Sequence, residues 1–141
     1  MLLKINTMLL AIDVGNTRIK SAVFEQDNMI EHFIFSADDF FIKMNNILES
    51  YPEIKTIVVA SVGNLEIKDF LAFEKSAKIV SITRDFKFPF TNLYESPATL
   101  GIDRMILASG ATIQFPSKNR LIIDAGTCIT YDFVDENDNY L

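Results

Sequence analysis

Cysteine and histidine are almost missing from this chain of 141 residues, which contains one of each. The single cysteine, Cys128, excludes an internal disulfide and is compatible with a reducing compartment. His32 lies in a β-prone stretch with no sequence link to Cys128, so the two do not predict a nucleophile with its base, and no metal-ligand spacing surrounds them. We expect Cys128 to be a small buried strand residue and His32 to face the solvent from a strand.

Basic residues and long apolar runs are scarce as well. The chain has 13 Lys and Arg against 19 Asp and Glu, a net charge of −6, and its basic residues stand singly. Nucleic-acid-binding faces need clustered Lys and Arg, so no nucleic-acid partner is expected. The apolar stretch Met1–Ile12 is interrupted by Lys4 and Asn6, is too short to span a membrane and lacks a signal-peptide cleavage site. We therefore expect a soluble, cytoplasmic protein without a membrane partner, and Met8 is an alternative start.

The chain has no low-complexity tract or flexible linker, and its 49% hydrophobic content predicts a substantial core. Its first 82 residues read as the order βββαβαβ, typical of a mixed sheet with flanking helices. The expected segments are strands at Met8–Ile12, Ile19–Glu25 and Met29–Phe35, a helix from Phe40 to Tyr51, a strand at Lys55–Val62, a helix at Leu65–Ser76 after the breaker Gly63-Asn64, and a strand at Lys78–Ile82. A less ordered passage, Thr83–Pro97, then precedes a helix from Leu100 to Gln114.

The first helix carries the clearest local signals. Ser36, three residues before Asp39, matches a capping box. The apolar residues that follow share one helical stripe and should be buried. They are Phe40, Phe41, Met44, Ile47 and Leu48.

One short pattern occurs twice. Met8–Thr17 and Leu121–Thr127 are each an apolar run that ends in Asp-x-Gly-(Asn)-Thr, and each continues into a second β-prone stretch, Ile19–Phe24 or Ile129–Val134. This pattern predicts two hairpins whose turns carry a carboxylate, a glycine and a hydroxyl. Two such hairpins facing each other can hold the phosphates of a nucleotide and its cation.

Each residue type in the repeat has a chemical reason. Glycine allows a close approach of the backbone and a positive φ, and consecutive N–H groups in such a turn bind anions. Asn16 and Thr17 add neutral donors. Asp13 and Asp124 repel phosphate, so they imply an intervening cation such as Mg²⁺, which prefers oxygen ligands. The alternative is an ordinary hairpin turn, in which Asp, Asn and Gly are favoured for local reasons.

A third cluster lies between the hairpins, from Tyr94 to Arg104. Gly101 can lie beneath a ligand, and Asp103 and Arg104 stand at the start of a helix, where anions are favoured. Arg104 can bind a carboxylate bidentately, and Asp103 can accept a proton from a hydroxyl. Alternatively, Asp103 is only a first-turn acid and Arg104 a surface charge.

Together the three clusters resemble the signature motifs of type III pantothenate kinase, a family of the acetate and sugar kinase, Hsp70 and actin superfamily. The matching residues are Asp13-Val-Gly-Asn-Thr17, Tyr94-x-x-Pro97-x-x-Leu100-Gly101-x-Asp103-Arg104 and Asp124-Ala-Gly-Thr127. The resemblance implies an α/β fold of ribonuclease H-like (actin-like ATPase) lobes: a first lobe at residues 8–98, then a linking helix and the first hairpin of a second, incomplete lobe at 99–141. Cys128 departs from the small residue, commonly Ala, that the family has there.

The resemblance also implies an activity, the ATP-dependent phosphorylation of pantothenate to 4′-phosphopantothenate at the start of coenzyme A biosynthesis, by a homodimer. Asp103 would be the catalytic base. Asp13 would also lie in the Mg²⁺ shell, and Asp124 would bind the monovalent cation, K⁺ or NH₄⁺. ATP would be bound by Asp13, Val14, Gly15, Asn16, Thr17, Arg18, Ile19, Lys20 and Thr127, and pantothenate by Tyr94, Gly101, Ile102, Asp103 and Arg104, with Arg104 on its carboxylate.

Two alternatives remain open from the sequence. One is another kinase or phosphatase of the superfamily with the same hairpins. The other is a truncated, non-catalytic nucleotide-binding chain, one that could carry the label of a transcriptional activator of the Bvg accessory factor family, although its acidic charge does not favour DNA binding. Apolar strand edges in the second hairpin lead us to expect self-association and weak activity of the 141-residue form.

Overall fold

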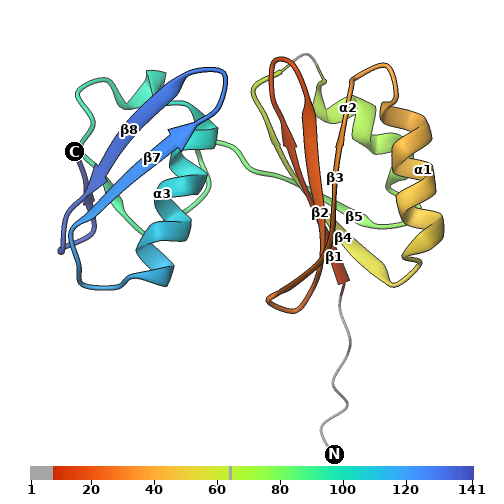
Figure 1. The fold of residues 1–141 in the computed structure, drawn as a ribbon, viewed down its shortest axis with the longest axis horizontal. Coiled ribbons are helices and arrows are strands. Elements are labelled where there is room, and N and C mark those ends of the chain that lie inside the picture. The colour runs from red at the N-terminus through yellow and green to blue at the C-terminus, as the bar shows by residue number, and fades with distance from the viewer. Residues whose placement is uncertain (1–7, 64) are drawn as a thin grey trace, which may run out of the picture. The chain divides into compact units, whose positions relative to one another are not determined.

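The computed structural model describes residues 8–63 and 65–141, which form two compact units divided after Ile82 (Figure 1). The residues before Met8, on which the expected alternative start depends, and Asn64, expected as part of a helix breaker, lie outside this range. The boundary expected from the sequence lies later, at residue 98. Residues after Ile82 instead bond within the second unit: Arg84 Nη2 donates to the Leu100 carbonyl at 2.8 Å, and the Phe90 ring lies 5.4 Å from that of Tyr140.

The first unit has the order βββαβαβ that the sequence predicts. Its sheet has the strand order β3-β2-β1-β4-β5, in which β1, β2 and β3 are antiparallel neighbours and β4 and β5 run parallel to β1. This arrangement is a mixed α/β, ribonuclease H-like lobe. Its elements are β1 (Met8–Val14), β2 (Ile19–Glu25), β3 (Asn28–Phe35), α1 (Phe40–Ser50), β4 (Ile54–Ser61), α2 (Ile67–Phe70), the 3₁₀ turn η1 (Leu71–Phe73) and β5 (Lys78–Ser81).

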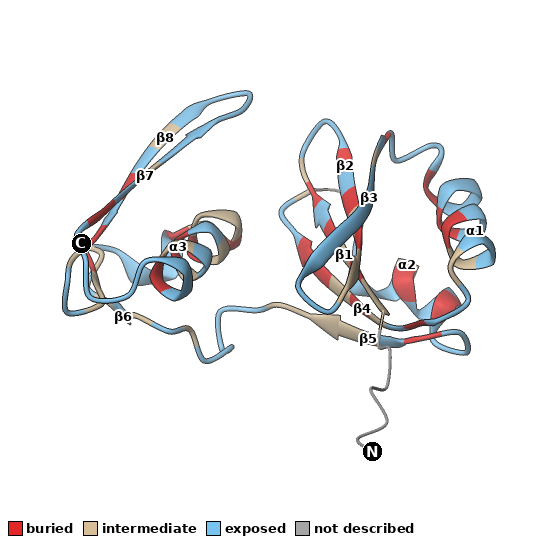
Figure 2. Cartoon of the chain, turned by 60° about the horizontal axis from the view of Figure 1, so that its bottom comes forward, coloured by how far each residue is buried: buried red, intermediate tan, exposed pale blue. Residues whose placement is uncertain are grey.

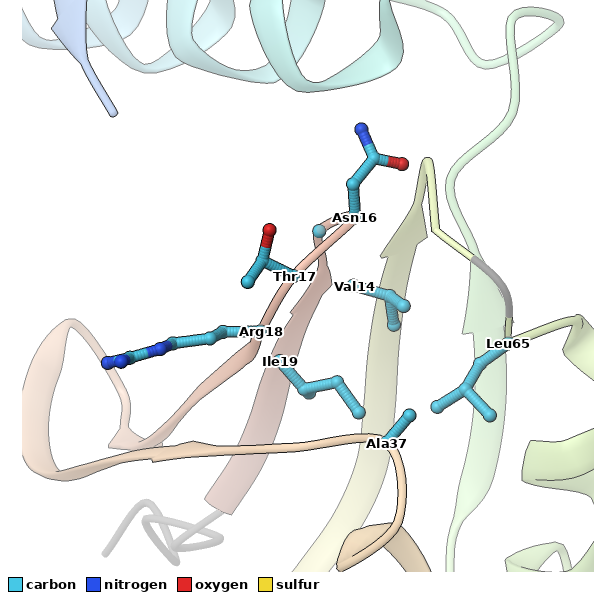
Figure 3. Close-up of a pocket in the computed structure, with 8 residues that line it drawn as sticks. Val14, Asn16, Thr17, Arg18, Ile19, Ala37 and Leu65 are labelled. Atoms are coloured by element: carbon cyan, nitrogen blue, oxygen red, sulfur yellow. The ribbon is translucent and has the colours of Figure 1, made fainter. Parts of the chain in front are cut away.

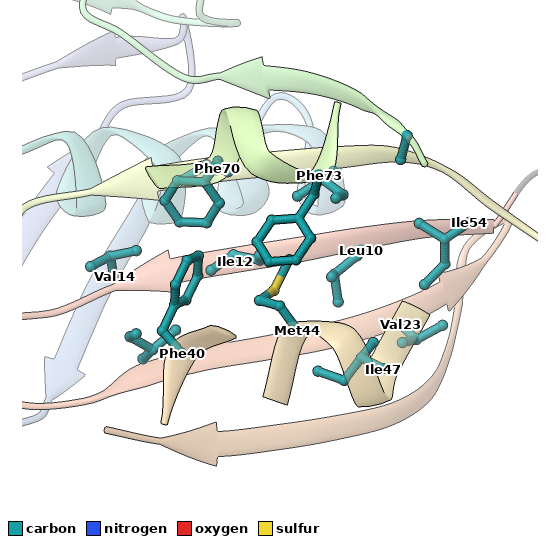
Figure 4. Packing of buried hydrophobic residues seen from close by; sticks show 14 of the residues in the cluster. Leu10, Ile12, Val14, Val23, Phe40, Met44, Ile47, Ile54, Phe70 and Phe73 are labelled. Carbon is teal, nitrogen blue, oxygen red and sulfur yellow. The ribbon is translucent and has the colours of Figure 1, made fainter. Parts of the chain in front are cut away.

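Alternation along the strands places one face of this sheet under the helices (Figure 2). On β1, Leu10, Ile12 and Val14 are buried, because every second side chain points to the same face. Phe40 of α1 packs edge-on against Phe70 of α2, with 4.9 Å between ring centroids (Figure 4). The core therefore supports the ends of β1 and β2, where the first turn begins.

Two helix predictions need correction. The Ser36 hydroxyl donates to the Asp39 carboxylate at 2.9 Å, and Asp39, the N-cap of α1, makes no side-chain capping bond. The capping box is therefore absent there, and the structure forms one between Glu66 and Asp69 instead. The helix expected at 65–76 is shorter, because α2 ends after four residues and the chain continues as η1.

The predicted stripe on α1 is confirmed in part. Phe40, Met44 and Ile47 are buried, and Leu48 is partly buried against the same core. Phe41 is 51% exposed, because adjacent helical residues differ by about 100° around the axis.

The second unit contains the predicted second hairpin. Its sheet has the order β6-β9-β8-β7, and β7 and β8 are antiparallel, with Leu121 opposite Phe133 and Asp124 opposite Thr130. The strands β6 and β9 were not expected, since two residues show no periodicity. Its elements are β6 (Thr91–Asn92), the 3₁₀ turn η2 (Pro97–Thr99), α3 (Ile102–Gln114), β7 (Arg120–Ala125), β8 (Ile129–Val134) and β9 (Asn139–Tyr140).

The two faces of the β7–β8 hairpin differ. Arg120, Asp132 and Val134 are buried on the face that α3 covers. The opposite face is apolar and exposed, with Ile123 at 56% and Tyr131 at 63% exposure (Figure 2). Within the described part of the chain, no helix has the length and apolar character needed to cross a membrane.

Candidate active site

The first turn connects β1 to β2 and surrounds a small cavity. Its volume is about 30 Å³, enough for roughly two water molecules. The apolar side chains of Val14, Ile19 and Leu65 converge on it, whereas Asn16 and Thr17 extend away from it (Figure 3). A nucleotide cannot fit inside this cavity, so the turn can offer a ligand only its exposed outer groups.

Gly15 does not adopt the positive φ that the sequence suggested, and neither does Gly126. The Gly15 N–H donates to the Arg18 carbonyl at 3.0 Å and so closes the turn. A Cβ atom at Gly15 would lie 3.0 Å from that same oxygen, tighter than nearly all real contacts. Glycine is therefore needed for close approach within the turn, and Asn16 and Thr17 of the turn are exposed.

Gly63 supports this turn, whereas the sequence predicted only a break in the chain there. The N–H groups of Val62 and Gly63 both donate to the Val14 carbonyl, at 3.0 and 3.1 Å. A Cβ atom at Gly63 would collide with the carbonyl oxygen of Gly15. Its position just beyond a strand parallel to β1 is the signal that could have identified it.

Asp13 and Lys20 lie opposite each other on β1 and β2. Both are exposed, and both point away from the core because their neighbours Ile12, Val14 and Ile19 are buried on the other face. Residues directly opposite in an antiparallel pair share a face. The base of the first turn therefore presents a carboxylate and an ammonium group together.

The second turn connects β7 to β8 and is closed by a backbone hydrogen bond of its glycine, as the first turn is. The Gly126 N–H donates to the Cys128 carbonyl at 3.0 Å, and Asp124 and Thr127 are exposed. Cys128 is exposed in the turn, so its predicted place in a buried strand is wrong. β8 begins only at Ile129, which leaves Cys128 outside the ladder.

Neither turn gathers a set of metal ligands by itself. Within residues 8–63 and 65–141, no group of three or more His, Cys, Asp and Glu side chains could hold a metal ion. A cation held by Asp13 or by Asp124 would take its other ligands from backbone, water or phosphate oxygens, as Mg²⁺ commonly does.

The N-terminus of α3 carries the third predicted cluster. Gly101 is the N-cap residue of α3, and Asp103 is an acidic residue in the first turn of this helix. A Cβ atom at Gly101 would meet the Asp103 carboxylate, so this carboxylate folds back over the N-cap. The absence of a side chain at Gly101 thus leaves room for Asp103 at the helix end.

Arg104 is held by Asp132 of β8, a residue that the sequence analysis missed. The Arg104 Nε–H donates to Asp132 Oδ1 at 2.8 Å, and Nη2 donates to the same oxygen. The guanidinium carbon also lies 5.4 Å from the centroid of the Tyr94 ring. The structure therefore brings together Tyr94 and Arg104, which the sequence placed in one cluster, and adds a buried carboxylate.

These contacts set the charge states of the cluster. Hydrogen bonding to Asp132 raises the pKa of Arg104 above its usual value against the opposing effect of desolvation, so the guanidinium stays charged. The Tyr140 hydroxyl also donates to Asp132 Oδ1. Burial, and then this bond to Asp132, raise the pKa of Tyr140, which stays neutral. A charged residue in the mostly apolar stretch of β8 is the signal that could have identified Asp132.

A family model described as type III pantothenate kinase matches residues 9–141, a range that includes both turns and the start of α3. The chain belongs to the type III pantothenate kinase family. Type III pantothenate kinases of Flavobacterium johnsoniae and Flavobacterium psychrophilum are 58% and 57% identical to it over 134 and 133 residues. The matches cover 95% and 94% of this chain and 55% of each of those proteins. The chain thus spans about half the length of these relatives.

A solved structure supports the fold. The crystal structure of a conserved protein of Campylobacter jejuni, assigned to the Baf family of transcriptional activators, matches with a TM-score of 0.52 at 23% identity. The match covers 94% of this chain and 51% of that one. At 23% identity the match shows only that the two chains share a fold.

Proposed function

We propose that the complete gene product containing this chain phosphorylates pantothenate with ATP, forming 4′-phosphopantothenate in the first step of coenzyme A biosynthesis. The observation that carries the proposal is the family match over residues 9–141. The relatives named type III pantothenate kinase, at up to 58% identity, agree with it.

For ATP, the first turn and its flanking strands supply donors at an exposed edge. Phosphoryl transfer depends mainly on positioning and on neutralising the charge of the phosphates. Exposed Asn16, Thr17 and Lys20 suit that task, and Thr127 offers a hydroxyl from the second turn. The ATP-binding residues that we propose are Asp13, Val14, Gly15, Asn16, Thr17, Arg18, Ile19, Lys20 and Thr127.

The two repeated carboxylates suit hard cations. Asp13 would hold a water of the Mg²⁺ shell, and Asp124 would bind the monovalent cation, K⁺ or NH₄⁺. Both carboxylates are exposed at the base of a turn, where oxygen groups of the backbone and of Thr side chains are close in sequence. The cations would neutralise phosphate charge that an aspartate alone would repel.

For pantothenate, the start of α3 supplies both a base and a carboxylate-binding group. Arg104 would bind the carboxylate of the substrate. Asp103 would accept the proton of its primary hydroxyl as that oxygen attacks the γ-phosphorus, and the bond from this phosphorus to the bridging oxygen would break to release ADP. Tyr94, Gly101 and Ile102 would complete the site. The contact of Tyr94 with Arg104 supports a shared role.

We also propose a homodimer, a cytoplasmic location, and a division into a first lobe at residues 8–98 and the start of a second lobe at 99–141. The exposed apolar face of β7 and β8 is a surface that a further chain segment or subunit could cover. The boundary at residue 98 differs from that of the compact units of the structure, which divide after Ile82.

The test is an assay of the purified complete gene product with MgATP, K⁺ and pantothenate. Formation of 4′-phosphopantothenate is followed by mass spectrometry, with glucose and acetate as control substrates. We expect turnover with pantothenate only, and turnover only of a control substrate would refute the proposal.

A further inference from the structure

Asp132 holds one edge of the Arg104 guanidinium. Its side chain is 1% exposed, whereas that of Arg104 is 24% exposed. A single oxygen, Oδ1, accepts hydrogen bonds from Arg104 Nε, Arg104 Nη2 and the Tyr140 hydroxyl. The carboxylate is therefore anchored from β9 while it orients a partly exposed cation on α3.

Asp132 occupies one edge of the Arg104 guanidinium, and the Tyr94 side chain also hydrogen-bonds Arg104. Arginine has five N–H donors in a planar fork, and Asp132 accepts from the Nε side and from one Nη2 hydrogen. The edge formed by Nη1 and the second Nη2 hydrogen is not used by Asp132. A carboxylate can bind such an edge with two parallel hydrogen bonds, and the Tyr94 ring near the guanidinium restricts its rotation.

Stability alone does not account for this arrangement. The second oxygen of Asp132, Oδ2, is buried and has no hydrogen-bond partner among the residues that the structure describes. An unsatisfied buried acceptor destabilises a fold, and buried ion pairs are often no better than well-packed apolar residues. A role in orienting Arg104 gives a reason for a carboxylate at this position.

We propose that Asp132 is a positioning residue that fixes Arg104 so that its outer edge meets the carboxylate of the acceptor substrate. The inference rests on the proposed function, because it assumes a substrate that carries a carboxylate. It adds to that function a residue of β8 that acts through Arg104 and does not touch the substrate.

The first test compares Asp132→Asn with the wild type in the complete gene product, using pantothenate and pantothenyl alcohol, which lacks the carboxylate. We expect the KM for pantothenate to rise about 10-fold, the equivalent of one charge-assisted hydrogen bond. The KM for ATP and the kinetics with the alcohol should stay within twofold of wild type. An equal loss with both acceptor substrates would overturn the proposal.

Asp138→Asn is the matched control, because Asp138 pairs with another arginine of the same unit, Arg120, at 2.7 Å. It changes an aspartate to asparagine in an arginine pair that lies outside the cluster around Arg104. We expect it to leave the KM for pantothenate unchanged. If it raises this KM as much as Asp132→Asn does, the effect is general destabilisation and the proposal is wrong.

A second measurement does not depend on turnover. The Arg104 Nε–H resonance, assigned by its loss in Arg104→Lys, should exchange slowly with solvent in the wild type and at least 10-fold faster in Asp132→Asn. Fast exchange in the wild type would overturn the positioning role. Slow exchange in a wild type that does not phosphorylate pantothenate would refute the proposed function and leave Arg104 held by Asp132.

Discussion

Replacing Gly63 by alanine should damage the first turn from the outside. The new Cβ would collide with the carbonyl oxygen of Gly15 and lie 3.1 Å from the Val14 side chain. Backbone atoms cannot move aside as a flexible side chain can, so the end of β4 must shift away from β1. That shift breaks the two hydrogen bonds that Val62 and Gly63 donate to the Val14 carbonyl.

The expected cost follows from these contacts. Two backbone hydrogen bonds contribute about 0.5–1.5 kcal/mol each, and overpacking adds about 1–3 kcal/mol, so we expect a loss of roughly 2–6 kcal/mol. In a unit of this size, about 2 kcal/mol lowers Tm by roughly 8–16 °C. The displaced turn should also raise the KM for ATP, by about 10-fold if 1.4 kcal/mol of binding is lost.

The assay is thermal unfolding by circular dichroism, together with ATP kinetics of the complete gene product. Gly110→Ala is the matched control, because a Cβ atom there meets nothing within 4 Å. Gly110 lies inside α3, so alanine should stabilise the chain by about 0.5–1 kcal/mol. If Gly63→Ala is as stable as wild type and binds ATP equally well, the close approach of β4 to the turn does not matter.

Four further predictions follow from the site. Asp103→Asn should lower kcat by about 10²–10⁴ while ATP binding measured by calorimetry stays nearly intact, and turnover within threefold of wild type would remove it from the role of base. Asp13→Ala should weaken the use of MgATP, whereas Asp124→Ala should change the response to K⁺, and an unchanged K⁺ titration would contradict that assignment. The 141-residue chain should self-associate through the apolar face of β7 and β8, so Ile123→Lys should shift it toward monomer in sedimentation; a wild-type monomer with full turnover would contradict this. Hydrogen bonds from the Asn139 side chain and from backbone N–H groups of Asn139 and Asn137 lower the pKa of Asp135 in the folded state. Its contribution to the free energy of unfolding is therefore present above about pH 4 and is lost as pH falls through the lowered pKa. Asp135→Asn should make the free energy of unfolding less dependent on pH in this acid range.

Local sequence patterns were sufficient to predict a strand, helix or turn where interactions between neighbouring residues determine its structure. Runs of β-branched and other apolar residues predicted β1, β2, β7 and β8. The structure shows which face of β1 packs on the core, because Leu10, Ile12 and Val14 are buried. Helical periodicity likewise predicted Phe40, Met44 and Ile47 as core residues. The two repeated turns could be predicted from the sequence, because a hairpin turn depends on residues that are neighbours in the chain.

Two predictions for single residues, Ser36 and Cys128, were wrong because another local arrangement was available to each. The Ser36 hydroxyl bonds the Asp39 carboxylate and not the backbone, so the pattern of a capping box did not produce one. Cys128 reads as part of a strand, but the turn ends one residue later than its β-prone neighbours suggest. In both cases the choice between two nearby arrangements depends on small energy differences that composition does not show.

The sequence by itself determined the order of the elements in the first unit, the two turns and the resemblance to the family. Only the tertiary structure decided that Gly63 must be a glycine, because the atom it avoids belongs to Gly15, 48 positions earlier in the chain. It also decided that Arg104 is oriented by Asp132, which lies on a different element. Contacts of this kind depend on how α3 packs on β8 and how β4 aligns with β1. The residue pattern within one segment does not show which residues of another segment it contacts.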